Sequence, residues 1–333
     1  MTRLRLLPLF SVCAVAAGCA LITPKIEPMD KTGWKTYCFG RYLVDLPPQA
    51  KVNAMYKVRG NKIQPMPGEV PSTLKSRVDR REAELRGAKH ETQGSMFVRR
   101  VPLVNGSEIL FSWSLPYSEV MLQSDVYLVA DKSDDVFQYG GDVSPDRVEI
   151  ALRHATGLAD NIRSRSDDEI PSGPGFCIDK GFIAGSEYRS ERFEVGVTLP
   201  EHPNAFINID ASTGAEQDRL LERVDRFLLL AVGQRLTGLD VLRKRERDVG
   251  PIQAEEYATA ASGNGQRVYA FAWESQGKNK SLSEQNISAD LHVLEQSVVT
   301  ERTPYLPAFQ SDEEALQLWD AIIESIRLRP GAV

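Results

Sequence analysis

The sequence is poor in the residues that most often carry out catalysis, with four histidines and four cysteines among 333 residues. The histidines stand singly, and no His-Glu-X-X-His or Cys-X-X-Cys motif supplies zinc ligands at a familiar spacing. The Gly-X-Ser-X-Gly elbow of serine hydrolases and the Walker loop are also missing. Residues 263–268, Gly-Asn-Gly-Gln-Arg-Val, lack the third glycine of a dinucleotide motif. We therefore expect no metal, no cofactor and no enzymatic activity.

Acidic residues, by contrast, are plentiful: 46 Asp and Glu stand against 40 Lys and Arg, which gives a net charge of −6. No pair of carboxylates is marked out by its spacing, so a divergent envelope hydrolase with its carboxylates in loops is a minor alternative. A mildly acidic chain also gives no electrostatic basis for binding nucleic acid. The run Arg-Lys-Arg-Glu-Arg at residues 243–247 is basic, and an isolated run of this kind is typical of a solvated face.

A long apolar run occurs near the N-terminus and is followed by a cysteine. Two arginines within residues 3–5 precede the mostly apolar residues 6–15, and the small residues 16–18 precede Cys19. This order is typical of a secretory signal peptide. The cysteine at the cleavage site resembles the lipobox of bacterial lipoproteins, in which the thiol receives a diacylglycerol. We expect residues 1–19 to form a lipoprotein signal peptide and Cys19 to be lipidated, since more than one acyl chain anchors a protein stably.

Two alternatives to the lipid anchor follow from details of the same segment. Ala16 stands three positions before Cys19, where the lipobox usually has Leu, so a plain secretory signal with an incidental Cys19 is the first. A transmembrane helix is the second and weaker one, because the run is short and Pro24 ends it. The lipoprotein and the secretory signal both place the protein in the periplasm. Ala20, in a position where Asp would retain a lipoprotein in the inner membrane, favours the outer membrane.

The remainder of the chain contains the same landmarks twice. Residues 37–47 read Tyr-Cys-Phe-Gly-Arg-Tyr-Leu-Val-Asp-Leu-Pro, and residues 175–183 read Gly-Phe-Cys-Ile-Asp-Lys-Gly-Phe-Ile. Ile-Arg-X-Arg occurs at 162–165 and again at 326–329, and the offset grows from 139 residues at the cysteines to 164 at these motifs. Growth in one direction is what insertions into a duplicated unit would give. Chance similarity between two unrelated α+β domains is the alternative, because each motif is short.

The length of the chain also favours two domains. We expect an N-terminal domain over residues 20–166 and a C-terminal domain over 176–333. Residues 167–175, which are rich in Ser, Gly, Pro and acidic residues, read as a linker between them. If each domain has its own core, a cut near Gly173 should yield two folded halves.

The apolar periodicity predicts the same kinds of element in both halves. In the first half we expect strands at 42–46, 95–103, 108–115 and 120–130 and a turn at Asn105-Gly106. A helix that begins at Ser72 has Leu74, Val78 and Leu85 on one face, and a second helix begins at Ser144. In the second half we expect strands at 195–199, 206–209, 252–260, 267–275 and 287–298, a helix over about 215–235, and a helix opened by the Ser311–Glu314 capping box. The fold class is therefore α+β, with two similar domains, each an antiparallel sheet backed by two helices.

Cys38 and Cys177 occupy matching positions in the two halves. If Cys19 is acylated, these two form the one possible disulfide of the processed chain, and an oxidising periplasm would permit it. Two cysteines can bond only if their Cα atoms come within about 7 Å, which a sequence does not show. Two free, buried cysteines are an equal alternative.

The motifs around Cys38 and Cys177, in this order, resemble the immunity proteins that protect bacteria against phospholipase effectors of the type VI secretion system, specifically the fourth lipase-immunity class. The likeness covers nearly the whole chain after the signal peptide, as an N-terminal and a C-terminal domain. It implies a periplasmic protein without catalysis, whose two domains grip the cognate effector and keep its lipid-binding site shut. A structural or assembly lipoprotein of the cell envelope, without a toxin partner, is the alternative.

Contacts with such a partner would come from aromatic and polar residues in loops, since interface hot spots are rich in Trp, Tyr and Arg. The candidates are Tyr117, Tyr139, Tyr188, Arg189, Trp273, Gln276 and Lys278. Pro or charged neighbours keep Tyr117 and Tyr188 near solvent, whereas Trp273 lies in a strand pattern that is more typical of the core. We expect both halves to contribute contacts.

Overall fold

The computed structural model describes residues 29–131, 133–231 and 238–333, so Cys19 and the expected signal peptide lie outside the described residues. The first half contains β1 (Lys35–Phe39), β2 (Tyr42–Leu46), β3 (Lys51–Val58), β4 (Asn61–Pro65), α1 (Pro71–Gly87), β5 (Phe97–Pro102), β6 (Glu108–Trp113), β7 (Leu122–Val129), β8 (Val136–Val143), α2 (Val148–Asn161) and β9 (Ile162–Ser164). The second half contains β10 (Gly175–Ile178), β11 (Gly181–Ala184), β12 (Glu191–Thr198), β13 (Ala205–Ser212), α3 (Leu220–Ala231), β14 (Leu239–Glu246), β15 (Glu255–Gly263), β16 (Gln266–Glu274), β17 (Asn286–Val293), α4 (Asp312–Ile323) and β18 (Arg327–Leu328). A hairpin, two strands, a helix, four strands, a helix and a short strand therefore occur twice in the same order.

Twelve strands form one continuous antiparallel sheet, in the order β14-β15-β16-β17-β13-β12-β3-β4-β8-β7-β6-β5. The two halves meet at its centre, where β3 pairs with β12 from Lys51 opposite Thr198 to Val58 opposite Glu191. The sequence predicts a separate sheet in each half. The structure instead joins the two sheets into one through β3 and β12. Pairing satisfies the backbone N–H and C=O groups that each half would otherwise expose at this edge.

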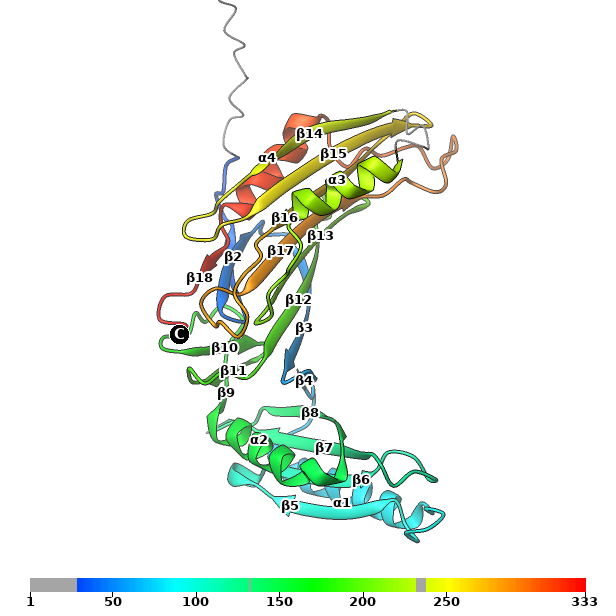
Figure 1. The fold of residues 1–333 in the computed structure, drawn as a ribbon, viewed down its shortest axis with the longest axis vertical. Coiled ribbons are helices and arrows are strands. Elements are labelled where there is room, and N and C mark those ends of the chain that lie inside the picture. Colours follow the sequence, from blue (N-terminus) through cyan, green and yellow to red (C-terminus); the bar gives the residue numbers. More distant parts are fainter. Residues whose placement is uncertain (1–28, 132, 232–237) are drawn as a thin grey trace, which may run out of the picture.

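The hairpin of each half pairs with the closing strand of the other half. β18, from the end of the second half, pairs with β2, and β9, from the end of the first half, pairs with β11. The resulting sheets, β1-β2-β18 and β10-β11-β9, lie beside the middle of the large sheet (Figure 1). A cut near Gly173 would separate both of these pairs and also β3 from β12. The two halves are therefore not expected to fold separately after such a cut.

The helices α1 and α2 lie on opposite faces of the large sheet. Successive residues of a strand point to opposite faces. Along β7, Val126 and Leu128 share a buried cluster with Leu158 of α2, whereas Tyr127 shares one with Val78 of α1. The two helices of this half thus do not cover one face together.

The second half divides its helices in the same way. On β15, Glu256 accepts a hydrogen bond from Nε1 of Trp319 in α4, whereas its neighbour Glu255 accepts one from the backbone N–H of Leu221 in α3. Adjacent residues of one strand therefore meet different helices. Figure 1 shows α3 and α4 at one end of the molecule and α1 and α2 at the other.

Several local predictions are confirmed. Three expected residues of α1 are buried, namely Leu74, Val78 and Leu85. The side chain of Ser311 caps α4 by accepting a hydrogen bond from the backbone N–H of Glu314 at 3.1 Å. Asn105 and Gly106 turn the chain between β5 and β6 with φ angles of 57° and 79°, which these two residues tolerate well.

The basic run at residues 243–247 is not the solvated face that its charge suggested. Its first four residues belong to β14, whose side chains alternate between the two faces of the sheet. The side chains of Arg243 and Arg247 are 12% and 8% exposed, and both pair with the fully buried carboxylate of Glu256. Lys244, on the opposite face, pairs with Asp225 of α3. A strand rich in charge could not be recognised from apolar alternation because its inward residues are arginines.

The molecule as a whole is elongated and curved (Figure 1). The end that carries β5 and α1 and the end that carries β14 and α3 both extend to the same side, to the right in this view, beyond the paired strands β3 and β12. The first half forms one arm of this curve and the second half forms the other. A curved body of this kind can contact a partner with both arms at once.

Candidate binding surface

One face of the central strands is left open. Along β12, Phe193, Val195 and Val197 are buried in the core, while the alternate residues are exposed or half-buried. The outward residues of β3, β12, β13 and β17 form what we call the open face: Lys51, Asn53, Met55, Lys57, Arg192, Glu194, Gly196, Thr198, Phe206, Asn208, Asp210, Ser212, Asn286, Ser288, Asp290 and His292. Most of these side chains are polar, so this face suits contact with a polar protein surface.

Charged residues of the open face already pair with one another. Arg192 lies 2.7 Å from a carboxylate oxygen of Glu194 and 3.6 Å from one of Asp210. Asp210 also accepts a hydrogen bond from the hydroxyl of Ser288. Partial burial raises the pKa of Asp210 despite these contacts. Because the pairs are internal, a partner can add contacts here without leaving unpaired charges.

A second group on this face combines a histidine with an aromatic ring. Nε2 of His292 lies 2.9 Å from the carboxylate of Asp290, and this hydrogen bond raises the pKa of the imidazole. The side-chain amide of Asn208 donates to the same oxygen, Asp290 Oδ1, at 2.9 Å. Phe206 lies opposite His292 in the sheet and is 42% exposed. Phe206 is a large apolar side chain in otherwise polar surroundings, which is common at protein contacts.

Exposed apolar side chains occur in loops at the ends of both arms. In the loop between β6 and β7, Tyr117 is 66% exposed and Val120 is 74% exposed. In the segment between β17 and α4, Leu294, Val298 and Leu306 are each 58% exposed. We call these two loops the arm tips. They extend to the same side of the molecule in Figure 1. Single exposed apolar residues are ordinary, but groups of them at the ends of both arms favour a binding role.

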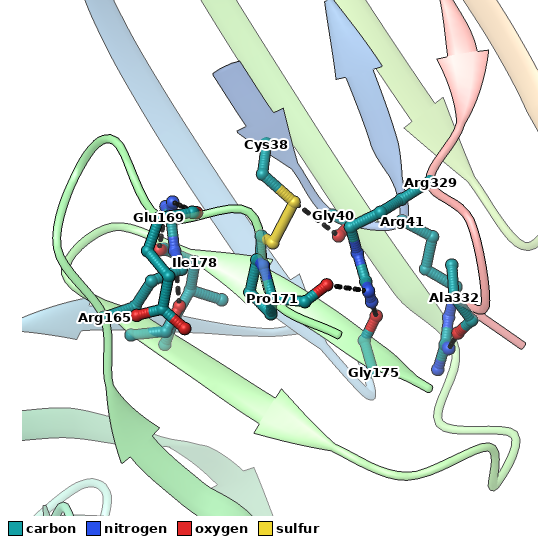
Figure 2. Close-up of a disulfide and its surroundings, with 12 residues drawn as sticks. Cys38, Gly40, Arg41, Arg165, Glu169, Pro171, Gly175, Ile178, Arg329 and Ala332 are labelled. Atoms are coloured by element: carbon teal, nitrogen blue, oxygen red, sulfur yellow. Dashed lines mark hydrogen bonds between the residues drawn. A yellow bond between two sulfur atoms is a disulfide. The ribbon is translucent and has the colours of Figure 1, made fainter. Parts of the chain in front are cut away.

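A disulfide joins the halves at the centre of the molecule (Figure 2). Cys38 and Cys177 are bonded, with their Cα atoms 5.9 Å apart. Beside it, Gly40 and Cys177 exchange two backbone hydrogen bonds of 3.0 and 2.7 Å. Gly40 has a φ of +57°, and a Cβ there would lie 2.6 Å from the ring of Phe193. Glycine is therefore the residue that this close approach requires.

Buried arginines surround the disulfide and tie segments of both halves together (Figure 2). Arg41 and Glu191 form a two-pronged ion pair at 2.6 and 2.7 Å, with neither side chain exposed. Arg165 donates to the carbonyl of Ile178, and Arg329 donates to that of Gly175. Burial lowers the pKa of both guanidinium groups. Arg165 and Arg329 are the last residues of the two Ile-Arg-X-Arg motifs, whose repetition was visible in the sequence although their role was not.

The described residues contain no group of three or more His, Cys, Asp or Glu side chains that could hold a metal ion. In the same part of the chain, no helix is long and apolar enough to cross a membrane.

Two family models match the chain in sequence. The N-terminal domain of Tle cognate immunity protein 4 matches residues 35–138, and the C-terminal domain of the same protein matches residues 169–331. The chain belongs to the Tle cognate immunity protein 4 family. As a member of an immunity-protein family, it is not an enzyme.

Solved structures of this family resemble the chain over most of its length. One is the apo structure of TplEi, an immunity protein of the type VI secretion system from Pseudomonas aeruginosa. Its sequence is 47% identical to this one, the match covers 90% of this chain and 99% of that chain, and the TM-score is 0.85. A Tle4–Tli4 complex contains a chain that is 47% identical, covering 91% and 99% with a TM-score of 0.87. A structure of TplEi in complex with an "L" peptide is 46% identical in sequence. The match covers 90% of this chain and 100% of that chain, with a TM-score of 0.81. A comparison with curated protein sequences finds no match.

The structure separates the seven candidate contact residues into exposed and buried ones. Tyr117 and Tyr188 are exposed by 66% and 39%. Tyr139 is not in a loop at all but lies in β8, 7% exposed, and its hydroxyl donates to the carbonyl of Val58. Arg189 is 5% exposed and Trp273 is fully buried. For these three the expectation of a surface contact is wrong.

The buried candidates have structural partners instead. Nη1 of Arg189 donates to the carbonyl of Ala184, and Nε1 of Trp273 donates to that of Arg247. Gln276 and Lys278 are exposed and line a cavity in the second half, whose lining includes no residue of the arm tips. Tyr139 belongs to a strand together with the two glycines that follow it. The charge of Arg189 suggested a surface position, but its guanidinium lies in the interior and also comes within 4.0 Å of the carboxylate of Glu187.

Proposed function

We propose that this protein binds a cognate phospholipase effector of the type VI secretion system and inhibits it by gripping it with both arms. The observation that carries the proposal is the curved sheet, whose two arm tips expose apolar side chains on the same side of the molecule. The Tle4–Tli4 complex, which contains a chain 47% identical to this one, supports a partner of the same kind. A stable interface buries about 1,600 Å². Two arms and an open face offer that area without a change of fold.

The proposal is tested with the cognate lipase, which we expect to be encoded beside the gene of this protein. The purified protein should form a one-to-one complex with that lipase and abolish its release of fatty acid from phospholipid vesicles. The protein alone should release none, because it is not an enzyme. Full lipase activity in the presence of a molar excess of the protein would refute the proposal.

Substitutions at the arm tips test whether both arms take part. We expect Tyr117→Ala and Leu306→Ala each to weaken binding by about tenfold, because each removes an exposed apolar side chain from the centre of a contact. The effects should add in the double variant, since the two loops are far apart. Isothermal titration or surface plasmon resonance measures them.

Ile170→Ala is the matched control, because Ile170 is 40% exposed but lies in the segment between the halves. Its affinity should equal that of the unchanged protein. If only one of the two tip variants weakens binding, the grip by two arms is wrong and one arm suffices.

The location of the protein belongs to the same proposal. We propose that the processed protein is a lipoprotein of the outer membrane that faces the periplasm, with acylated Cys19 as its anchor. The support is the order of basic, apolar and small residues before Cys19. A lipid anchor would hold the inhibitor beside the membrane leaflets on which a phospholipase acts.

Replacing the anchor residue tests the location. Cys19→Ser should shift the protein from the membrane fraction to the aqueous phase, or leave it unprocessed, because the acylated thiol is lost. Detergent-phase partitioning of cell extracts, with a Cys13→Ser variant as control, measures the change. Unchanged partitioning of Cys19→Ser would show that no lipid is attached there.

We also propose that the arms are two copies of one unit, each an antiparallel sheet with two helices. The identical order of elements in the halves supports this. The alternative of an envelope lipoprotein without a toxin partner has no observation in its favour.

A further inference from the structure

A cavity in the second half is distinct from the open face and from the arm tips. Its volume is about 680 Å³, within the range of cavities that hold ligands. It lies where the connection between β16 and β17 meets the connection between β14 and β15 and the first residues of α3. Tyr42 and Leu328 line it from the small sheet β1-β2-β18.

Gln285 lines this cavity, and its carboxamide is buried without a hydrogen-bond partner among the described residues. The residue is 2% exposed, and both Oε1 and Nε2 are buried without a hydrogen bond. The polar groups beside it are satisfied: the hydroxyl of Ser275 accepts from the backbone N–H of Ile287 at 2.9 Å, and the amide of Asn286 donates to the carbonyl of Ser275. A buried amide without hydrogen bonds destabilises a protein, so such groups are rare outside functional sites.

A second buried glutamine in the same half shows the ordinary arrangement. Gln266 is 8% exposed, and its side chain both donates to the carbonyl of Gln296 and accepts from the backbone N–H of Gln296, at 3.1 and 2.8 Å. Its carboxamide thus pairs with a backbone N–H and a backbone C=O. The carboxamide of Gln285 has the same donor and acceptor atoms, but neither atom has a hydrogen-bond partner.

The charged residues around the cavity are mostly acidic. The lining contains five carboxylates, from Glu246, Asp248, Glu255, Glu274 and Glu284, and two cations, from Arg219 and Lys278. Glu284 and Lys278 form an ion pair of 2.7 Å, with side chains 55% and 70% exposed. An exposed pair of this kind is weak and can be replaced by a ligand cation.

We propose that this cavity takes an extended segment of the bound effector, with a peptide group hydrogen-bonded to the Gln285 carboxamide and a Lys or Arg side chain beside Glu284. A peptide group presents a donor and an acceptor, as the backbone of Gln296 does for Gln266. This binding requires the side chain of Gln285 to rotate, so that its buried carboxamide turns toward the cavity. The inference rests on the proposed function, because the segment belongs to the effector.

Gln285→Leu separates this role from a structural one. Leucine keeps the bulk and removes the unpaired amide, so the free protein should melt roughly 2 °C or more higher. The same change should weaken binding of the purified lipase about tenfold, because the bound peptide group loses its partner. Gln266→Leu, the matched control, should lower the melting temperature and leave the affinity unchanged.

An array of overlapping 15-residue peptides from the lipase, probed with both proteins, identifies the segment. The unchanged protein should retain a peptide that contains Lys or Arg, and Gln285→Leu should not. If the lipase binds both proteins equally, the inference is wrong while the proposed function stands. A lower melting temperature of Gln285→Leu also overturns it, since the fold then needs the amide. If the unchanged protein does not bind the lipase, the proposed function itself fails.

Discussion

Glu256→Ala is expected to lower the free energy of unfolding by about 3–5 kcal/mol, because it removes a fully buried negative charge that three arginines share. The carboxylate of Glu256 is fully buried in β15, between β14 and α4. It accepts from Arg243, Arg245 and Arg247, the inward side chains of the charged strand and of the residue that follows it. It also accepts from Nε1 of Trp319 at 2.7 Å.

Asp320 offsets part of the loss of stability expected from Glu256→Ala. This carboxylate of α4 also pairs with Arg243 and Arg247, and Arg247 pairs with Glu324 as well, so both guanidinium groups keep an acidic partner after the substitution. The indole N–H of Trp319 loses its hydrogen-bond acceptor, and Arg243, Arg245 and Arg247 each lose the hydrogen bond to Glu256. Urea unfolding followed by tryptophan fluorescence measures the loss, and the emission of the folded protein should shift because Trp319 loses its hydrogen bond.

Two further variants make the expectation testable even if Glu256→Ala does not fold. Glu256→Gln keeps an acceptor for Trp319 and removes the charge, so its loss should be intermediate. Glu246→Ala is the matched control: Glu246 pairs with Arg219, but its side chain is 76% exposed, so its loss should be at most about 1 kcal/mol. If Glu256→Ala costs no more than this control, the buried carboxylate does not hold β14 and α4 together.

The sequence predicted those elements whose signals are local. The capping serine of α4, the buried stripe of α1 and the turn at Asn105-Gly106 depend on neighbours within a few residues, and the structure has all three. The repeated motifs likewise indicated a duplicated order of elements, and the elements do occur twice in that order.

Long-range pairing could not be predicted in this way. Apolar alternation tells which residues of β3 and β12 point inward, but not that these two strands pair with each other. Nor does it tell that β18 pairs with β2 of the opposite half. Arg41 and Glu191 are 150 residues apart and each looks like a surface residue until the fold brings them together. Charge that is buried in pairs has no periodic signature.

The prediction of surface contacts was wrong where it relied on residue type alone. Tyr139 and Trp273 are aromatic and Arg189 is charged, but all three lie in the interior with backbone carbonyls as partners. Tyr117, next to a proline in a short connection, was predicted from its surroundings and is exposed. The neighbours of a residue therefore gave the better signal for a surface position.

Removal of the disulfide is expected to lower stability and leave affinity nearly unchanged. The bond joins residues 139 positions apart, and a disulfide that closes a long loop stabilises a protein mainly by restricting the unfolded chain, by roughly 2–5 kcal/mol. Cys38→Ser/Cys177→Ser should therefore unfold at a lower urea concentration. Oxidised and reduced samples of the unchanged protein should show the same difference.

The affinity for the lipase should change less than threefold in that double variant. The relative position of the arms depends on the eight residue pairs between β3 and β12 and on the buried Arg41–Glu191 pair, all of which remain. Surface plasmon resonance at a temperature where both proteins are folded measures this. A tenfold loss of affinity without a loss of stability would mean that the disulfide sets the angle between the arms. The expected result means that the disulfide acts by restricting the unfolded chain, and that the continuous sheet holds the two arms in position.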